Sequence, residues 1–293
     1  MWLLVLNRHS GKGQIDKKLQ EFIGLCKLNK ITYEIIDQDT PKQTETLLRS
    51  KLDQGTFNAV VAFGGDGLVS LCLQFLGESS IGFSVVPTGT GNDFARSIGT
   101  FGKSISQIFR TIYATEKVKL DLALVANKNS KRYFMQVLSV GFDASVNEYA
   151  NQMRWPKGKI KYTFAMLRLL PRARNLDLTI ISQKQVLQVK SMLIAVANGS
   201  TYGGGMKILP DASYSDGMLD LLYVDPVSKL TLLSIFPRVF KGSHINHPAV
   251  HILKGEKFEL RGNTKSFADG EFIGELPLEI SVIKNGLSTW ICK

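Results

Sequence analysis

Short apolar runs alternate with amphipathic stretches through the first hundred residues of the chain. The apolar runs have the length of strands, and the stretches between them repeat their apolar positions at helical spacing. The runs are Trp2–Leu6, Thr32–Ile36, Ala59–Phe63 and Gly82–Val86, and the helical stretches are Ile15–Leu28 and Thr44–Leu52. Strands that alternate with helices predict a parallel sheet covered on both faces. Such sheets bind ligands at the carboxyl ends of their strands.

The pattern changes from about residue 120, where longer β-type runs follow one another. Neighbouring strands joined by Gly, Asn and Ser turns predict an antiparallel, β-rich second domain. The segment Asn127–Ser130 has the composition of a hairpin turn between two of these runs. The runs are Leu120–Ala126, Tyr133–Val140, Leu176–Ile181, Val186–Ala197, Met218–Val224, His251–Leu260 and Leu278–Ile283.

Composition narrows the class of protein and its partners. The 293 residues suffice for two domains, and 44% hydrophobic with 21% charged residues excludes collagen-like, coiled-coil and low-complexity chains. The net charge of +11 favours an anionic partner, which is a nucleotide, a nucleic acid or an acidic membrane. Cys26, Cys72 and Cys292 are too scattered for a disulfide framework, so we expect reduced thiols in a cytosolic protein. Because no stretch resembles a secretory signal or a membrane span, a lipid would be met from the aqueous side.

Three glycine-bearing loops follow three of the predicted strands. The first, Asn7–Gly13, opens a helix but lacks the spacing of a Walker A loop. The second is Gly64-Gly65-Asp66-Gly67, whose glycines allow a close approach of the backbone to a ligand. The third, Pro87–Arg96, offers hydroxyl, amide and backbone donors together. Because parallel strands end at one edge, we expect the three loops to converge on one site.

The order of these motifs resembles the diacylglycerol kinase catalytic-domain family. The resemblance rests on Asn-x-x-Ser-Gly from Asn7, on Gly-Gly-Asp-Gly from Gly64 and on Pro-x-Gly-Thr-x-Asn-Asp-Phe-Ala from Pro87. The bacterial soluble lipid kinases are the nearer relatives, and the sphingosine kinases are more distant. The resemblance implies a three-layer α/β nucleotide-binding domain over residues 1–121, similar to those of NAD kinase and diacylglycerol kinases, to which residues 286–293 return. It also implies a β-rich, sandwich-like domain for lipid and metal over residues 122–285.

The same resemblance implies an ATP-dependent lipid kinase that uses Mg²⁺ and converts diacylglycerol to phosphatidic acid. Asp269, in Ala268-Asp269-Gly270-Glu271, would be the general base, and Glu271 and Asp66 would complete an acidic network around Mg²⁺. A structural Mg²⁺ would bind the Asp216 carboxylate and the main-chain carbonyls of Ser213 and Met218. Asn92 and Asp93 would brace the third loop. The implied nucleotide contacts are Asn7, Ser10, Gly11, Thr40, Gly64, Gly65, Asp66, Gly67 and Thr90.

The chain departs from the family pattern in two places. Leu68, Ser70 and Leu71 stand where the family has Thr, Asn and Glu, and Arg8 replaces a proline. Two alternatives therefore stay open beside an active lipid kinase. One is a degenerate, non-catalytic relative that binds nucleotide or lipid, and the other is NAD kinase, which shares the Gly-Gly-Asp-Gly loop.

A basic stretch with interleaved aromatic and apolar residues lies between residues 150 and 176. It suits a helix that docks on an anionic membrane surface from the cytoplasm, or a helix that packs on the second domain. No nucleic-acid recognition motif accompanies it, and the sequence leaves a homodimer open. His244, His247 and His251 are expected to form a polar loop rather than a metal site. The cations expected at the membrane are Arg154, Lys157, Lys159 and Lys161.

Overall fold

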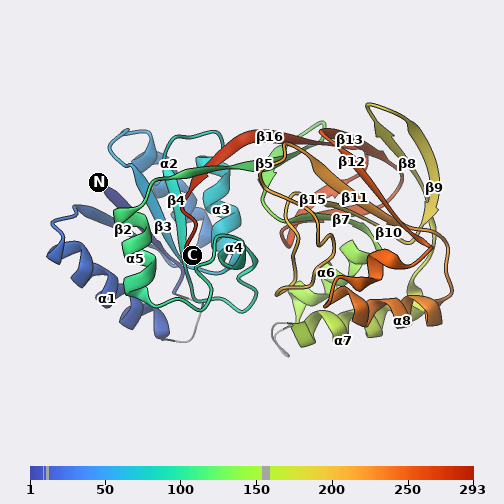
Figure 1. The fold of residues 1–293 in the computed structure, drawn as a ribbon, viewed down its shortest axis with the longest axis horizontal. Coiled ribbons are helices and arrows are strands. Elements are labelled where there is room, and N and C mark those ends of the chain that lie inside the picture. The colour runs from blue at the N-terminus through green and yellow to red at the C-terminus, as the bar shows by residue number, and fades with distance from the viewer. Residues whose placement is uncertain (9, 11–12, 154–158) are drawn as a thin grey trace. The chain divides into compact units, whose positions relative to one another are not determined.

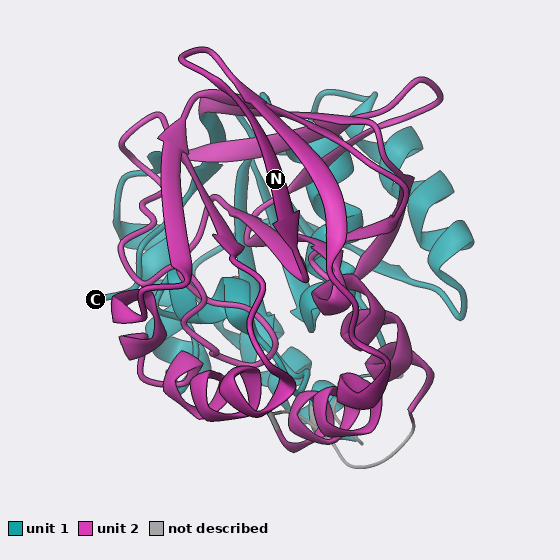
Figure 2. Ribbon diagram, turned by 90° about the vertical axis from the view of Figure 1, so that its right-hand side faces the viewer, with its two compact units in different colours: residues 1–120, 285–293 teal, residues 121–284 magenta. Residues whose placement is uncertain are grey.

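The computed structural model describes residues 1–8, 10, 13–153 and 159–293. Its chain divides into two compact units, residues 1–120 with 285–293 and residues 121–284 (Figure 2). The boundaries expected from the sequence differ from these by one residue. Each unit encloses its own apolar core.

The first unit is built on a parallel sheet, as the sequence predicts (Figure 1). Its strand order is β2-β1-β3-β4, and the end of β16 (Leu278–Thr289) pairs parallel to β4 through Thr289 and Phe83. Because β1 to β4 run parallel, the carboxyl ends of all four lie at the same edge of the sheet. These strands are β1 (Trp2–Leu6), β2 (Tyr33–Asp37), β3 (Ala59–Gly64) and β4 (Gly82–Pro87).

Helices cover both faces of this sheet, which makes three layers. The even positions of β1 pack on Phe22 of α1 and Phe109 of α5, while α2 and α3 contact each other and the strands β2 and β3. Alternate residues of a strand point to opposite faces, so a continuously apolar β1 serves both layers. The helices are α1 (Gln14–Leu28), α2 (Pro41–Leu52), α3 (Asp66–Leu76), α4 (Asp93–Ser97) and α5 (Ile105–Ala114).

The second unit is antiparallel throughout its described strands. One sheet has the order β12-β11-β10-β7-β14-β15. The other joins β9, β8, β13 and the first part of β16, with β5 paired to β16 and β6. The strands are β5 (Val118–Ala126), β6 (Lys131–Phe134), β7 (Val137–Gly141), β8 (Leu176–Ser182), β9 (Val186–Ser191), β10 (Leu193–Ala197), β11 (Leu219–Val224), β12 (Val250–Gly255), β13 (Lys257–Arg261), β14 (Lys265–Ala268) and β15 (Glu271–Glu275).

The core of the second unit lies between these two sheets, and helices cover the outer face of the six-stranded one. Ile194 and Val196 of β10 point into the sandwich, whereas Ala195 and Ala197 point to the helices. The covering helices are α6 (Phe142–Gln152), α7 (Lys159–Leu169) and α8 (Lys229–Val239), with the short turns η1 (Leu170–Arg172) and η2 (Ser243–Asn246). In the described part of the chain no helix has the length and apolar character needed to cross a membrane.

The structure confirms the predicted fold class, but three of the predicted long strands are each two strands. Residues 133–140 break between β6 and β7, because the N–H groups of Met135 and Gln136 bind the side chain of Asp269. Residues 186–197 break at Met192, whose carbonyl accepts the N–H of Phe142. The third, 251–260, divides at Glu256 into β12 and β13, which belong to different sheets. The turn at residues 127–130 joins β5 to β6 as expected.

Candidate functional site

The three glycine-bearing loops meet at the carboxyl edge of the parallel sheet. Asp66, in the first turn of α3, ties the second loop to the third: its two carboxylate oxygens accept the N–H groups of Asn92 and Asp93, each at 2.8 Å. Burial raises the pKa of Asp66, and the backbone hydrogen bonds act in the opposite direction. Asp66 therefore holds the loop that opens α4.

The second and third loops approach each other so closely that only glycine fits. A Cβ atom on Gly89 would lie 2.6 Å from the Cα of Gly65. The first loop joins them through the Thr88 hydroxyl, which donates to Ser10 Oγ at 3.1 Å. The predicted convergence of three loops is thus confirmed as a set of direct contacts within the first unit.

The third loop is braced by Asn92 in the left-handed conformation, with φ of 56°. Its Nδ2 donates to the Gly89 carbonyl at 2.7 Å, which closes the loop on itself. Asn92 and Asp93 are both buried. Left-handed backbone is tolerated better by Asn than by most residues with a Cβ.

The remaining predicted nucleotide residues occupy the same edge or the loops around it. The Asn7 carbonyl accepts the Ser10 N–H at 3.0 Å, and the Thr40 hydroxyl caps α2 by accepting the Gln43 N–H. Gly67 and Thr90 are exposed, and Gly64 is buried at the end of β3. Gly11 lies outside the described residues.

Arg8 explains how the first loop is held without the usual proline. Its guanidinium binds Asp37 at the end of β2, with Nε–Oδ distances of 2.7 and 2.8 Å, and Asp16 of α1 at 2.6 Å. Hydrogen bonds to Asp37 and Asp16 raise the pKa of Arg8. An ion-paired clamp therefore stands where the family uses the fixed φ of proline.

Lys18 is a site residue that sequence reasoning missed. Its ammonium donates to the carbonyl of Pro87 at 2.6 Å, which places a cation beside the third loop. Burial lowers the pKa of Lys18. Its signal in the sequence was weak, because one lysine among several on a helix does not reveal which one turns inward.

In the second unit, the predicted catalytic segment forms the turn between β14 and β15. The Asp269 carboxylate accepts three backbone N–H groups, from Met135 at 2.7 Å, Gln136 at 3.0 Å and Val137 at 3.1 Å. Asp269 has a φ of 48°, a strained value for a residue with a side chain. Glu271, half-buried at the start of β15, has a carboxylate without a hydrogen bond or ion pair within the described residues.

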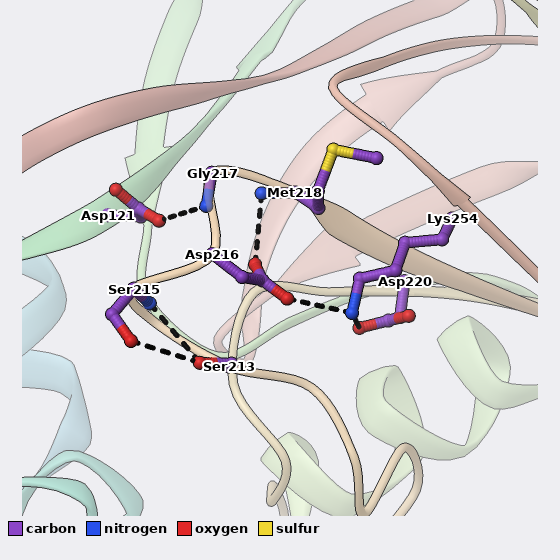
Figure 3. Close-up of polar contacts among 8 residues, drawn as sticks. All are labelled: Asp121, Ser213, Ser215, Asp216, Gly217, Met218, Asp220 and Lys254. Atoms are coloured by element: carbon purple, nitrogen blue, oxygen red, sulfur yellow. Dashed lines mark hydrogen bonds and ion pairs between the residues drawn. The ribbon is translucent and has the colours of Figure 1, made fainter.

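The predicted metal segment lies in the second unit as well. Its Asp216 carboxylate forms an ion pair with Lys254 (Figure 3). Asp216 accepts the Met218 N–H at 3.0 Å with one oxygen and binds the Lys254 ammonium at 2.7 Å with the other. Lys254 also lies 3.7 Å from Asp220, and Asp121 holds the turn by accepting the Gly217 N–H at 2.7 Å. A carboxylate with main-chain carbonyls suits Mg²⁺, but such an ion would have to displace Lys254.

A cavity lies between the outer face of the six-stranded sheet and the helices of the second unit. Its walls come from β10, β11, α6, α7, α8 and η2, and they are predominantly apolar. Asp143, Tyr162, Tyr202 and His244 supply polar groups. Such a lining suits a hydrophobic ligand.

Comparison with known proteins agrees with this geometry. Residues 1–125 match the diacylglycerol kinase catalytic domain, and residues 136–290 match the YegS C-terminal NAD kinase beta sandwich-like domain. A diacylglycerol kinase of Mycobacterium tuberculosis is 34% identical over 285 residues, which cover 96% of this chain and 92% of that protein. The chain belongs to the diacylglycerol kinase family. A diacylglycerol kinase of Staphylococcus carnosus is 27% identical, covering 99% of this chain and 94% of that one.

The family fold extends over the whole chain. A crystal structure of a diacylglycerol kinase from Bacillus anthracis str. Sterne superposes with a TM-score of 0.75 at 17% identity, covering 100% of this chain and 96% of that one. The positions where this member departs from the family motif are mainly packing positions. Leu68 is buried against Gly64, Ser70 is buried, and Leu71 is half-buried.

The basic stretch is helical in its described part, with an apolar stripe on its surface. Ile160, Phe164 and Leu167 of α7 are 67%, 48% and 48% exposed and share one helix face. Lys161 is half-buried, and burial lowers its pKa. Arg154, Lys157 and the side chain of Lys159 lie outside what the structure describes.

The three histidines of the second unit have separate partners. His244 is buried and its Nε2 lies 2.8 Å from the Ile208 carbonyl, and His251 Nε2 lies 2.7 Å from Asp225 Oδ2. His247 accepts the Ala249 N–H.

Proposed function

We propose that the protein is an ATP-dependent kinase that phosphorylates the hydroxyl of diacylglycerol to give phosphatidic acid. The observation that carries this proposal is the joining of three glycine-bearing loops at one sheet edge through Asp66, Gly89 and Ser10. Similarity over nearly the full chain to proteins named diacylglycerol kinase supports the choice of reaction.

The loops of the first unit would bind the nucleotide. Backbone N–H groups and hydroxyls at helix N-termini are donors suited to phosphate oxygens. The side chain of Lys18 adds a cation near the third loop. The proposed contacts are those that the sequence predicts, Asn7, Ser10, Gly11, Thr40, Gly64, Gly65, Gly67 and Thr90.

Mg²⁺ would neutralise the phosphate oxygens during transfer. Asp66 suits a place beside it, because each of its oxygens accepts one N–H and keeps a further lone pair. We also propose Asp216, with the carbonyls of Ser213 and Met218, as a structural Mg²⁺ site in competition with Lys254.

Glu271 is favoured over Asp269 as the general base. A base must have a lone pair free for the proton of the attacking hydroxyl. Backbone N–H groups hold the Asp269 carboxylate with two bonds to Oδ1 and one to Oδ2, whereas both oxygens of Glu271 are uncommitted within the described residues. Asp269 would then position the turn that presents Glu271.

The lipid would enter the second unit from the membrane surface on the cytoplasmic side. The apolar cavity suits acyl chains, and the exposed stripe on α7 with Arg168 suits an anionic bilayer. If this holds, Phe164→Glu will reduce co-sedimentation with vesicles containing anionic phospholipid, while the exposed Val186→Glu, on strand β9, will not. Equal loss in both variants, or loss in neither, would count against docking through α7.

The reaction is tested by transfer of labelled γ-phosphate from Mg-ATP to diacylglycerol in mixed micelles. We expect labelled phosphatidic acid with the wild type and none with Glu271→Gln. NAD offered as the acceptor should stay unlabelled. Binding of ATP without any transfer would instead support the non-catalytic relative, which Leu68 and Leu71 suggest.

A further inference from the structure

The cavity of the second unit contains a carboxyl group that apolar packing does not require. Asp143, in the first turn of α6, accepts the Tyr202 hydroxyl at 2.6 Å through Oδ1. Its Oδ2 is shielded from solvent and has no hydrogen-bond partner among the described residues. A buried polar atom without a partner costs about 1–3 kcal/mol, so its presence in a ligand cavity calls for a ligand atom that completes it.

The charge state of this carboxyl group defines the ligand atom. Burial is the largest effect on Asp143 and raises its pKa, while the hydroxyl groups of Ser139 and Tyr202 act in the opposite direction. A neutral carboxyl group that accepts from Tyr202 through Oδ1 can donate a proton from Oδ2. The group therefore suits an acceptor such as a carbonyl oxygen.

The other polar groups in the cavity exclude a charged head group. Among the residues that the structure describes, the lining has no lysine or arginine. Burial lowers the pKa of His244, which keeps its ring neutral, and its Nε2 is already bound to the Ile208 carbonyl. A phosphate would thus find no cation there, whereas an uncharged acyl ester would find mostly apolar walls, with the Asp143 carboxyl group placed among the hydroxyls of Tyr162 and Tyr202 and the Nδ1 atom of His244.

We propose that Asp143, oriented by Tyr202, is a specificity-determining residue that donates a hydrogen bond to an ester carbonyl of the acyl glycerol. This rests on the proposed function and deepens it, because it selects ester-linked neutral glycerolipids over ether-linked or amine-bearing lipids. The apolar walls bind the hydrocarbon chains whether these are joined to glycerol by ester or by ether bonds. Asp143 distinguishes the two, because only the ester has a carbonyl oxygen that can accept its hydrogen bond.

The test compares two substrates that differ only in the linkage, 1,2-diacylglycerol and a 1,2-dialkylglycerol of equal chain length. We expect the wild type to show a KM about tenfold lower for the diacyl lipid, the typical effect of one buried hydrogen bond. Asp143→Leu should remove this preference by raising the KM for the diacyl lipid alone. Asp143→Asn keeps a donor and should retain it. Equal effects of Asp143→Leu on both lipids would overturn the proposal, as would a preference for sphingosine.

Two controls separate this role from others. Asp143→Leu removes the acceptor of the Tyr202 hydroxyl and should lower the melting temperature, so the KM values of the variants are compared at a temperature where each variant is fully folded. If the wild type phosphorylates neither glycerolipid, the proposed function fails. Equilibrium binding of the same two lipids in micelles then decides the linkage preference without turnover.

Discussion

Asp269 and Val137 are joined by a reciprocal pair of hydrogen bonds. The Val137 N–H donates to Asp269 Oδ1 and the Asp269 N–H donates to the Val137 carbonyl, both at 3.1 Å. This pair attaches the turn between β14 and β15 to the start of β7. The same carboxylate takes the two preceding N–H groups, so one side chain both ends β6 and fixes the turn that carries Glu271.

The two acidic residues of this turn should respond differently to neutral replacements. Asp269→Asn presents an amide to three N–H donors and should lower the free energy of unfolding by about 1–3 kcal/mol. Glu271→Gln should leave stability unchanged and lower kcat by about 10²–10⁴-fold, the usual loss of a general base. Urea unfolding and the micelle assay measure the two effects. If Glu271→Gln stayed active while Asp269→Asn was stable and inactive, the base would be Asp269.

Glycine 89 should be intolerant of a methyl group although it lies in a loop. In Gly89→Ala the new Cβ would collide with the backbone of Gly65, which forces the second and third loops apart and weakens ATP binding. Gly24→Ala in α1 is the matched control, since its Cβ meets nothing within 4 Å. That control should stabilise the protein by about 0.5–1 kcal/mol and bind ATP normally. Calorimetric titration with Mg-ATP measures ATP binding by both variants. Unchanged binding in Gly89→Ala would contradict the close packing of the loops.

Because the folded protein raises the pKa of Asp143, the free energy of unfolding should fall as pH rises. Its folded-state pKa lies above the ordinary value of 3.8, so the folded protein holds the proton more tightly than the unfolded chain. The stabilising contribution is complete below that ordinary value and is lost as pH rises through the folded-state pKa. Urea unfolding over a pH series that rises from 3.8 should show the wild type losing stability relative to Asp143→Asn as the pH increases. His244, Tyr162 and Tyr202 are the other titratable groups that line the cavity. If the difference in stability between the wild type and Asp143→Asn stayed constant with pH, the raised pKa of Asp143 would be contradicted.

Lys254 should control how the protein responds to Mg²⁺. Its ammonium neutralises Asp216 and lies near Asp220, whose pKa is raised mainly by burial. Lys254→Met removes this cation, so we expect a lower melting temperature in EDTA and a larger rise on addition of Mg²⁺ than in the wild type. The double variant with Asp216→Asn should lose that rise. Equal Mg²⁺ responses in all three proteins would show that Asp216 is not a metal ligand.

Much of the first unit could be predicted because its signals are local. The continuous apolar run Trp2–Leu6 indicates a strand with both faces buried, and the glycine-bearing loops follow such strands directly. Parallel strands end at one edge, so convergence of the loops followed from their order along the chain. The direct contacts, such as Thr88 to Ser10, could not be predicted, because they depend on the twist and spacing of strands.

The second unit was predicted less well at its strand ends. Antiparallel strands with short turns were evident, but residues 133–140 have the pattern of one strand. The break depends on the Asp269 carboxylate, which accepts the Gln136 N–H from 133 residues away and leaves no signal in the local sequence. Similarly, the Asp216 segment read as a turn or a metal site, and the competing Lys254 lies on a different strand.

The sequence by itself determined the fold class, the two-domain order and the loops that would carry nucleotide chemistry, because hydrophobic periodicity and glycine placement act over a few neighbouring residues. Only the tertiary structure decided which carboxylates are engaged and which are available. It assigned Asp66 and Asp269 to backbone N–H groups, left Glu271 uncommitted within the described residues, and enclosed Asp143 in an apolar cavity. Hydrogen-bond partners and desolvation are set by surfaces that meet across large sequence separations, and that information is absent from any local pattern.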